Sequence, residues 1–172
     1  REEMGLTNVI PMVPFCRTIE EAEKILEIMA SSGLITKFIA KKRRLRTKRL
    51  TPVYVMCEIP SNVILADSFL DIFDGMSIGS NDLTQLTLGL DRDSGIVNKV
   101  ANENDPAVKK LIAEVIKKCR ARKKYIGICG QAPSDYPEFS DFLVEEGIES
   151  ISLNPDTVIK TTIRVSKKER SK

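Results

Sequence analysis

The sequence of 172 residues contains no histidine. Histidine is the side chain that titrates nearest neutral pH, and it is the commonest metal ligand in proteins. These residues therefore supply no histidine general base, no histidine metal ligand and no histidine phosphoryl carrier. A mechanism that needs one of these must obtain it from elsewhere.

Long apolar runs are also absent. No stretch approaches the roughly 20 continuous apolar residues that a membrane-spanning helix needs, so we expect no membrane partner. A content of 42% hydrophobic and 30% charged residues indicates an ordinary globular domain with a sizeable core. The first residues, Arg1-Glu2-Glu3-Met4, are neither a basic signal start nor an initiator methionine, so we expect a fragment of a longer protein.

The four cysteines lack the close spacing of a zinc site or of a CxxC redox motif. Because no targeting segment is present, we interpret them as reduced thiols and expect a cytoplasmic location. Cys57 lies inside an apolar run and Cys119 in a charged helical stretch, so neither is assigned a function. Cys16 remains ambiguous, and the neighbouring Arg17 is expected to form a surface ion pair.

Seven of the 27 basic residues form one run between Lys41 and Arg49. Without this run, 20 basic residues face 24 acidic ones, and the net charge is −4 rather than +3. No aromatic residue is interleaved in the run and the rest of the chain offers no basic face, so nucleic-acid binding is not expected. We interpret the run as a solvated loop within an atypical basic connection, residues 35–52.

Short apolar runs alternate with longer amphipathic stretches, which is typical of βαβ units in a parallel sheet. We predict strands over residues 9–15, 53–57, 76–78, 125–129 and 150–153. Helices are predicted from a cap at Thr18 to Gly33, from Ser61 or Asn62 to about residue 73, from Pro106 to about residue 122, from Ser134 to Gly147, and from Thr157 into a fraying lysine-rich tail.

The number of strands bears on the fold. A complete eight-stranded barrel typically needs about 250 residues, so five strands in 172 residues are too few. The predicted fold class is therefore α/β, an incomplete TIM barrel made of about the last five strands with their helices, with residues 1–172 in one domain. A free-standing Rossmann-like sheet is the alternative. Exposed sheet edges favour self-association, so a homo-oligomer is one expectation.

Carboxylates follow two of the predicted strands. In a parallel barrel all strands end on one face, where the active site lies. Glu58 and Asp82 follow neighbouring strands, and two carboxylates so placed can share a hard cation such as Mg²⁺. The alternative is that each caps the helix that follows it.

A glycine turn and a thiol occupy other strand ends. Gly79 permits close backbone approach, and the amides of Ser80 and Asn81 can bind a carboxylate or phosphate oxygen, unless the segment is only a tight turn into a helix. Cys129 ends a strand beside Gly130, and a thiol can exchange protons near neutral pH. The alternative is a buried structural cysteine.

Five segments together are distinctive: residues 11–18 (PMVPFCRT), 56–62 (MCEIPSN), 77–94 (SIGSNDLTQLTLGLDRDS), 127–131 (GICGQ) and 152–156 (SLNPD). In this order, and over nearly the whole chain, they resemble the C-terminal PEP/pyruvate-binding barrel domain of the PEP-utilizing enzyme family. The phosphoenolpyruvate synthases, or pyruvate, water dikinases, carry these motifs. Pyruvate phosphate dikinase and enzyme I of the sugar phosphotransferase system share the barrel, with looser matches.

The resemblance implies a kinase-type phosphotransferase reaction in which ATP, pyruvate and water give phosphoenolpyruvate (PEP), AMP and phosphate through a phosphohistidine. It implies that Mg²⁺ is held by Glu58 and Asp82, and that Cys129 exchanges the carbon-bound proton. The implied substrate-binding residues are Glu58, Gly79, Ser80, Asn81 and Asp82.

The resemblance also implies partners, namely the phosphohistidine and nucleotide-binding domains of a longer protein. The chain alone is therefore not expected to complete the dikinase reaction. A half-barrel that binds the ligand without turnover is the alternative of a different class.

Overall fold

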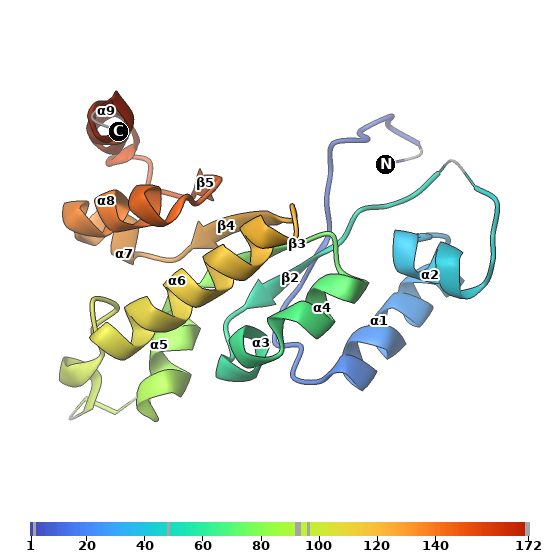
Figure 1. The fold of residues 1–172 in the computed structure, drawn as a ribbon, viewed down its shortest axis with the longest axis horizontal. Coiled ribbons are helices and arrows are strands. Elements are labelled where there is room, and N and C mark those ends of the chain that lie inside the picture. The colour runs from blue at the N-terminus through green and yellow to red at the C-terminus, as the bar shows by residue number, and fades with distance from the viewer. Residues whose placement is uncertain (2, 48, 92–93, 96, 171–172) are drawn as a thin grey trace.

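The computed structural model describes residues 1, 3–47, 49–91, 94–95 and 97–170. Within them, five parallel strands form one sheet in the order in which they occur along the chain (Figure 1). All five predicted strands are confirmed, although the two edge strands are only two residues long. The strands are β1 (Met12–Val13), β2 (Tyr54–Cys57), β3 (Gly75–Gly79), β4 (Tyr125–Cys129) and β5 (Ser150–Ile151).

The helices connect the strands, and two of them follow the predicted bounds closely. The first is capped by the Thr18 hydroxyl, which accepts a hydrogen bond from the amide of Glu21 at 3.2 Å. The helix that starts at Pro106 is capped by Asp105. The helices are α1 (Ile19–Ser31), α2 (Lys37–Lys42), α3 (Pro60–Ile64), α4 (Ala66–Ile72), α5 (Ser80–Leu88), α6 (Pro106–Ala121), α7 (Ala132–Asp135), α8 (Pro137–Glu146) and α9 (Val158–Arg170), with a 3-10 helix over Val97–Val100.

The helix predicted to begin at Ser61 or Asn62 instead begins at Pro60. Proline fits the first turn because its missing N–H would have no partner within the helix. The Asn62 side chain accepts a hydrogen bond from the amide of Ile59 at 3.1 Å, so it serves the helix start from inside the helix. The cap is Ile59, so the predicted cap is wrong by two or three residues, and the helix is interrupted between α3 and α4.

The helix predicted from Ser134 to Gly147 consists of α7 and α8, which meet at Tyr136. Tyr136 is extended (φ −121°, ψ 98°) because the helical conformation is disfavoured before a proline, here Pro137. Gly147 ends α8 in the left-handed conformation (φ 85°), as predicted. The last helix continues to Arg170, so the expected fraying is wrong up to that residue, and residues 171 and 172 lie outside the described part.

The sequence patterns missed two helices, α2 and α5. Helix α5 follows β3 without a loop, which agrees with the alternative that the segment Gly79–Asn81 is a tight turn into a helix. Within the basic connection, the Thr36 hydroxyl caps α2 by accepting from the amide of Ile39 at 3.2 Å, and the Ile39 side chain is fully buried. The loop interpretation of the run between Lys41 and Arg49 is therefore wrong for Lys41 and Lys42, which are exposed but belong to α2. It agrees with the exposed residues 43–47, and Lys48 lies outside the described part.

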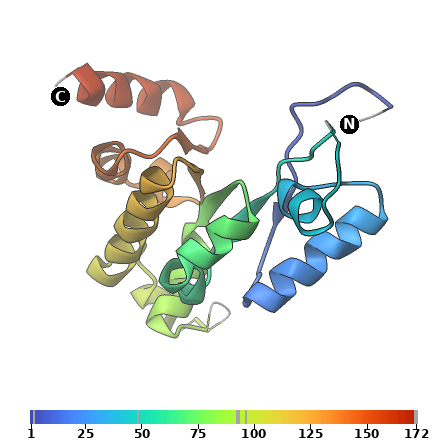
Figure 2. The same cartoon turned by 45° about the vertical axis from the view of Figure 1, so that its right-hand side comes forward.

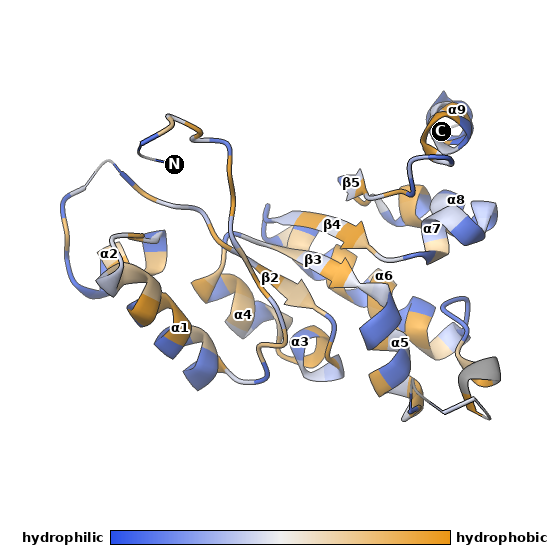
Figure 3. Cartoon of the chain, turned by 180° about the vertical axis from the view of Figure 1, so that it is seen from behind, coloured by the Kyte–Doolittle hydropathy of each residue, from blue (hydrophilic) through white to orange (hydrophobic). Residues whose placement is uncertain are grey.

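The core lies between the helices and one face of the sheet. Val55, Ile78 and Ile126 point into it and are fully buried. Helices α1, α4 and α6 lie next to one another on this face (Figures 1 and 2). From behind, β2, β3 and β4 face the viewer with no helix in front of them (Figure 3). No helix in the described part of the chain is long and apolar enough to span a membrane.

This arrangement confirms the predicted fold class. A doubly wound sheet reverses its strand order and carries helices on both faces, whereas here the order runs straight from β1 to β5. Sequential parallel strands with helices on one side are the geometry of an α/β barrel. The sheet does not close, which is consistent with part of a barrel.

Aromatic rings cover part of the open face. Tyr54 of β2 stacks on Tyr125 of β4, with ring centroids 4.5 Å apart, across Gly75 of β3. A side chain at Gly75 would place its Cβ 2.8 Å from both the Cβ and the carbonyl oxygen of Tyr125. The Tyr125 hydroxyl in turn shares a hydrogen bond with the Ser150 hydroxyl. Glycine at position 75 is therefore required for this packing.

We expect Gly75→Ala to lower the free energy of unfolding by about 1–3 kcal/mol, because the added methyl group overpacks a site bounded by backbone. Gly95→Ala is the matched control, since a Cβ there meets no atom within 4 Å. Urea denaturation of both variants measures the difference. Equal midpoints for the two variants would contradict the assigned packing.

Candidate active site

The strand register brings Glu58, Gly79 and Cys129 to one level of the open face. Gly79 pairs with Cys129, and Cys57 pairs with Ile78, so Glu58 comes beside Gly79. A Cβ at Gly79 would lie 2.9 Å from Cβ of Glu58. Because neighbouring strands are about 4.8 Å apart, the carboxylate and the thiol stand on strands roughly 10 Å apart. The carboxylate of Glu58 and the thiol of Cys129 thus lie on the same face of the sheet. They are separated by β3, which has Gly79 at this level.

Glu58 is held in a buried position, with 1% of its surface exposed. Its Oε1 accepts a hydrogen bond from the amide of Phe15 at 2.6 Å. Phe15 has a left-handed backbone (φ 48°), which is uncommon for a non-glycine residue and aims its amide at the carboxylate. Asn62 fixes the same region, because its side chain donates to the Cys16 carbonyl at 2.8 Å.

The charge of Glu58 is poorly solvated. Burial raises the pKa of the Glu58 carboxyl, the Phe15 amide partly offsets this, and the negative charge of Asp82 raises the pKa further. Asp82 lies in the first turn of α5, where the helix dipole favours a negative charge. The two carboxylates are therefore close enough to repel each other.

A divalent cation between the two carboxylates would relieve this repulsion. Among the residues that the structure describes, no group of three or more histidine, cysteine, aspartate or glutamate side chains could hold a metal. Mg²⁺ is commonly bound by one or two carboxylates, with substrate oxygens and waters as the other ligands. Glu58 and Asp82 fit this pattern.

Cys129 is the cysteine that remains accessible. It is half-buried, whereas Cys16, Cys57 and Cys119 are buried. Burial raises the pKa of Cys16 to about 11 and that of Cys119 to about 12, and it also raises the pKa of Cys57 above the usual range, so these three thiols stay protonated. The Ser77 hydroxyl donates to Sγ of Cys129 at 3.5 Å. Side chains alternate between the two faces along β3, so Ser77 lies on the same face as Gly79. The sequence could have identified Ser77 as a residue of this face from that alternation.

The turns after β3 and β4 interlock. The amide of Gln131 donates to Oδ1 of Asn81 at 3.3 Å. A Cβ at Gly130 (φ 150°) would lie only 2.0 Å from Oγ of Ser80, so glycine is required there. Ser80 is fully buried, and its hydroxyl lies beside the Glu103 carboxyl, whose pKa burial raises and this hydroxyl lowers in part. The predicted Gly79–Asn81 turn is therefore rigid and lies against the turn that carries Cys129.

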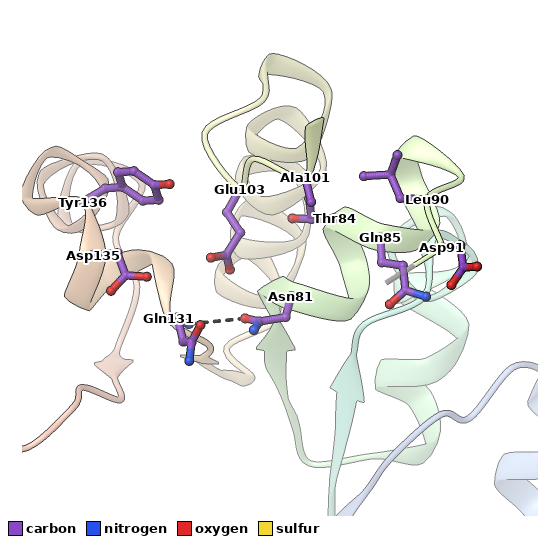
Figure 4. Close-up of a pocket in the computed structure, with 10 residues that line it drawn as sticks. All are labelled: Asn81, Thr84, Gln85, Leu90, Asp91, Ala101, Glu103, Gln131, Asp135 and Tyr136. Carbon is purple, nitrogen blue, oxygen red and sulfur yellow. Dashed lines mark hydrogen bonds between the residues drawn. The ribbon is translucent and has the colours of Figure 1, made fainter. Parts of the chain in front are cut away.

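A polar pocket of about 430 Å³ adjoins these turns. Asn81 and Gln131 line it, and Figure 4 shows both at the side where α5 begins. Glu103, Asp135 and Tyr136 also line it, with Asp135 beside Gln131 in Figure 4, and the sequence analysis missed all three. Burial raises the pKa of the Glu103 carboxyl. Residues 92 and 93 of the 77–94 motif lie outside the described part.

Glu58→Gln tests the electrostatic account. A carboxyl whose folded pKa is raised favours folding at pH values below its unfolded pKa, about 4.3, and this advantage is lost as the pH rises through the folded pKa. Without divalent cations, we therefore expect the variant to be more stable than the parent at pH 7, with the difference vanishing near pH 4.

Thermal melts between pH 4 and 8 in EDTA measure this effect. Glu138→Gln, at an exposed position in α8, is the control and should leave the pH dependence of the parent unchanged. A Glu58→Gln variant that is less stable than the parent at pH 7 would show that ionised Glu58 stabilises the fold.

Solved structures share the fold at low sequence identity. A HpcH/HpaI aldolase/citrate lyase family protein from Burkholderia cenocepacia superimposes with a TM-score of 0.59 at 16% identity, covering 95% of this chain and 65% of that one. A HpcH/HpaI aldolase from Desulfitobacterium hafniense gives a TM-score of 0.58 at 14% identity, covering 95% and 64%. These similarities support the fold alone.

Sequence comparison is more specific. Phosphoenolpyruvate synthases from Synechocystis sp. and Helicobacter pylori are each 56% identical over 99% of this chain, and that from Escherichia coli is 49% identical over 96% of it. The chain spans about a fifth (20%) of the length of these relatives. Residues 2–170 match the family described as PEP-utilising enzyme, PEP-binding domain, and the chain belongs to that family.

Proposed function

We propose that this chain forms the PEP/pyruvate-binding part of a phosphoenolpyruvate synthase and carries the proton-transfer site of its reaction. The observation that supports this most directly is the common level of Glu58, Gly79 and Cys129 on one face. The identity of 56% to relatives with that name supports the choice of reaction. The overall reaction would convert ATP, pyruvate and water to PEP, AMP and phosphate.

In this proposal, Glu58 and Asp82 hold Mg²⁺, which supplies positive charge near the enolate oxygen and the transferred phosphoryl group. The backbone amides at Ser80 and Asn81, in the first turn of α5, bind carboxylate or phosphate oxygens of the substrate. The thiolate of Cys129 takes a proton from the methyl carbon of pyruvate and becomes a thiol, which leaves the enolate that accepts the phosphoryl group. In the reverse direction the thiol returns that proton to the methylene carbon.

The remaining chemistry needs other residues. The chain has no histidine, so the phosphohistidine and the nucleotide would be bound by further domains of a longer cytoplasmic protein. The exposed edges at β1 and β5 offer unpaired backbone groups for such a region or for a second copy. A domain of a pyruvate phosphate dikinase or of a phosphotransferase-system enzyme I is the related alternative.

The binding step predicts a dependence on metal. We expect PEP to bind in the presence of Mg²⁺ and to bind at least about tenfold more weakly in EDTA or after Asp82→Asn, because one of two cation ligands is lost. Asp135→Asn, which neutralises a carboxylate in the adjoining pocket, is the control and should bind like the parent. Isothermal titration measures the affinities, and equal affinity with and without Mg²⁺ would rule out the carboxylate pair as a metal site.

The chemical step predicts exchange at carbon. In D₂O with Mg²⁺, we expect the chain to exchange the methyl protons of pyruvate, and Cys129→Ala to slow this by about a hundredfold or more while pyruvate still binds. Proton NMR follows the loss of the methyl signal. Cys119→Ala, which removes a buried thiol in α6, is the control. Binding without exchange by the parent would favour a non-catalytic half-barrel.

A further inference from the structure

A second cavity lies at the amino ends of the strands, at the end of the sheet away from the candidate active site. Asp74 comes directly before β3 and Lys124 directly before β4, while Lys37 and Lys41 reach the cavity from α2. Its volume is about 810 Å³, within the range of small-molecule sites. We call it the basal cavity. The basic connection that the candidate active site does not use thus supplies one of its walls.

Ion pairs lie on both rims of the basal cavity. On one rim, formed at α2, Nζ of Lys42 lies 2.8 Å from a carboxylate oxygen of Glu23. On the other, Arg122 pairs with Asp71. Lys42 also pairs with Glu27, which Arg43 shares, so this rim is neutral. Arg122 also pairs with Asp67, so the other rim carries one net negative charge.

The remaining cations are not balanced. Lys37 and Lys41 form no ion pair within the described part of the chain. Nζ of Lys124 donates to an uncharged group, the carbonyl of Phe73, at 2.7 Å. Three ammonium groups thus face a single carboxylate, that of Asp74, and after the second aspartate on Arg122 is counted the net surplus is one positive charge.

The charges around the cavity act on the ammonium group of Lys124. Burial lowers the pKa of its ammonium group, the nearby charges of Lys37 and Arg122 lower it further, and only Asp74 and Asp71 act in the opposite direction. An anion among these groups would relieve the repulsion. Because part of the cavity is buried, the attraction would be screened less than that of a surface cluster.

We propose that the basal cavity binds a phosphate monoester dianion whose organic part is a flat ring system. A phosphate group is attracted by the three ammonium groups that have no ion pair, and lysine is a common point-charge ligand of phosphate. The half-buried ring of Phe38 lines the same cavity, with Nζ of Lys42 5.7 Å from its centroid, and supplies an aromatic surface for the flat ring. Such a ligand would act at the end of the sheet opposite to Cys129, so the site is separate from the candidate active site.

Adenosine 5′-monophosphate (AMP), inorganic phosphate and adenosine are suitable probes, titrated in EDTA so that metal-dependent binding elsewhere does not contribute. We expect AMP to bind more tightly than either inorganic phosphate or adenosine, and its affinity to fall with added salt. In Lys37→Ala/Lys41→Ala, we expect AMP binding at least about tenfold weaker, because two of the three ammonium groups without an ion pair are removed. Lys124→Gln should act in the same direction.

Lys110→Ala/Lys160→Ala is the matched control, since it removes two exposed lysines from α6 and α9 that do not line the cavity. Its affinity for AMP should stay within about twofold of the affinity of the parent, which is a difference in binding free energy smaller than RT. Circular dichroism of each variant checks that the helices are intact.

Weakening by the α2 variant and not by the control supports the proposal. Equal AMP affinity in the two double variants would overturn it, as would undetectable binding of AMP to the parent at millimolar concentration. AMP that binds no more tightly than inorganic phosphate would also overturn it, because the ring would then contribute nothing.

Discussion

The parallel register between β2, β3 and β4 is the constraint on which the candidate active site depends. It sets Glu58, Gly79 and Cys129 at one level and turns all three to the same face. The middle position carries no side chain, and a Cβ there would meet Glu58 at 2.9 Å. A shift of one residue in either strand pair would turn the carboxylate or the thiol into the helix-covered core.

The position of the carboxylate is maintained against an electrostatic cost. Glu58 is buried beside another negative charge, and both effects oppose its ionisation. A left-handed Phe15 and a fully buried Asn62 hold the surrounding loops so that the carboxylate cannot turn toward solvent. Backbone strain and a buried acid with a shifted pKa are features that cluster at functional sites of proteins.

The two ends of the sheet differ in chemistry for a topological reason. Parallel strands gather all the β-to-α turns at one end and all the returning connections at the other. The first end carries the carboxylates, the thiol and the glycine turns. The second carries Asp74, Lys124 and the lysines of α2, so that Glu58, Asp82 and the Cys129 thiol are separated from these ammonium groups.

The sequence by itself determined the strands, the α/β class and the residues at the strand ends, because apolar runs and glycine turns are local signals. It also located α6 and its cap at Asp105, since capping depends on near neighbours. Only the tertiary structure showed that Ser77 touches Cys129, and that the basic connection contains α2 with Ile39 in the core. Those features depend on contacts between residues distant in sequence, which no local pattern specifies.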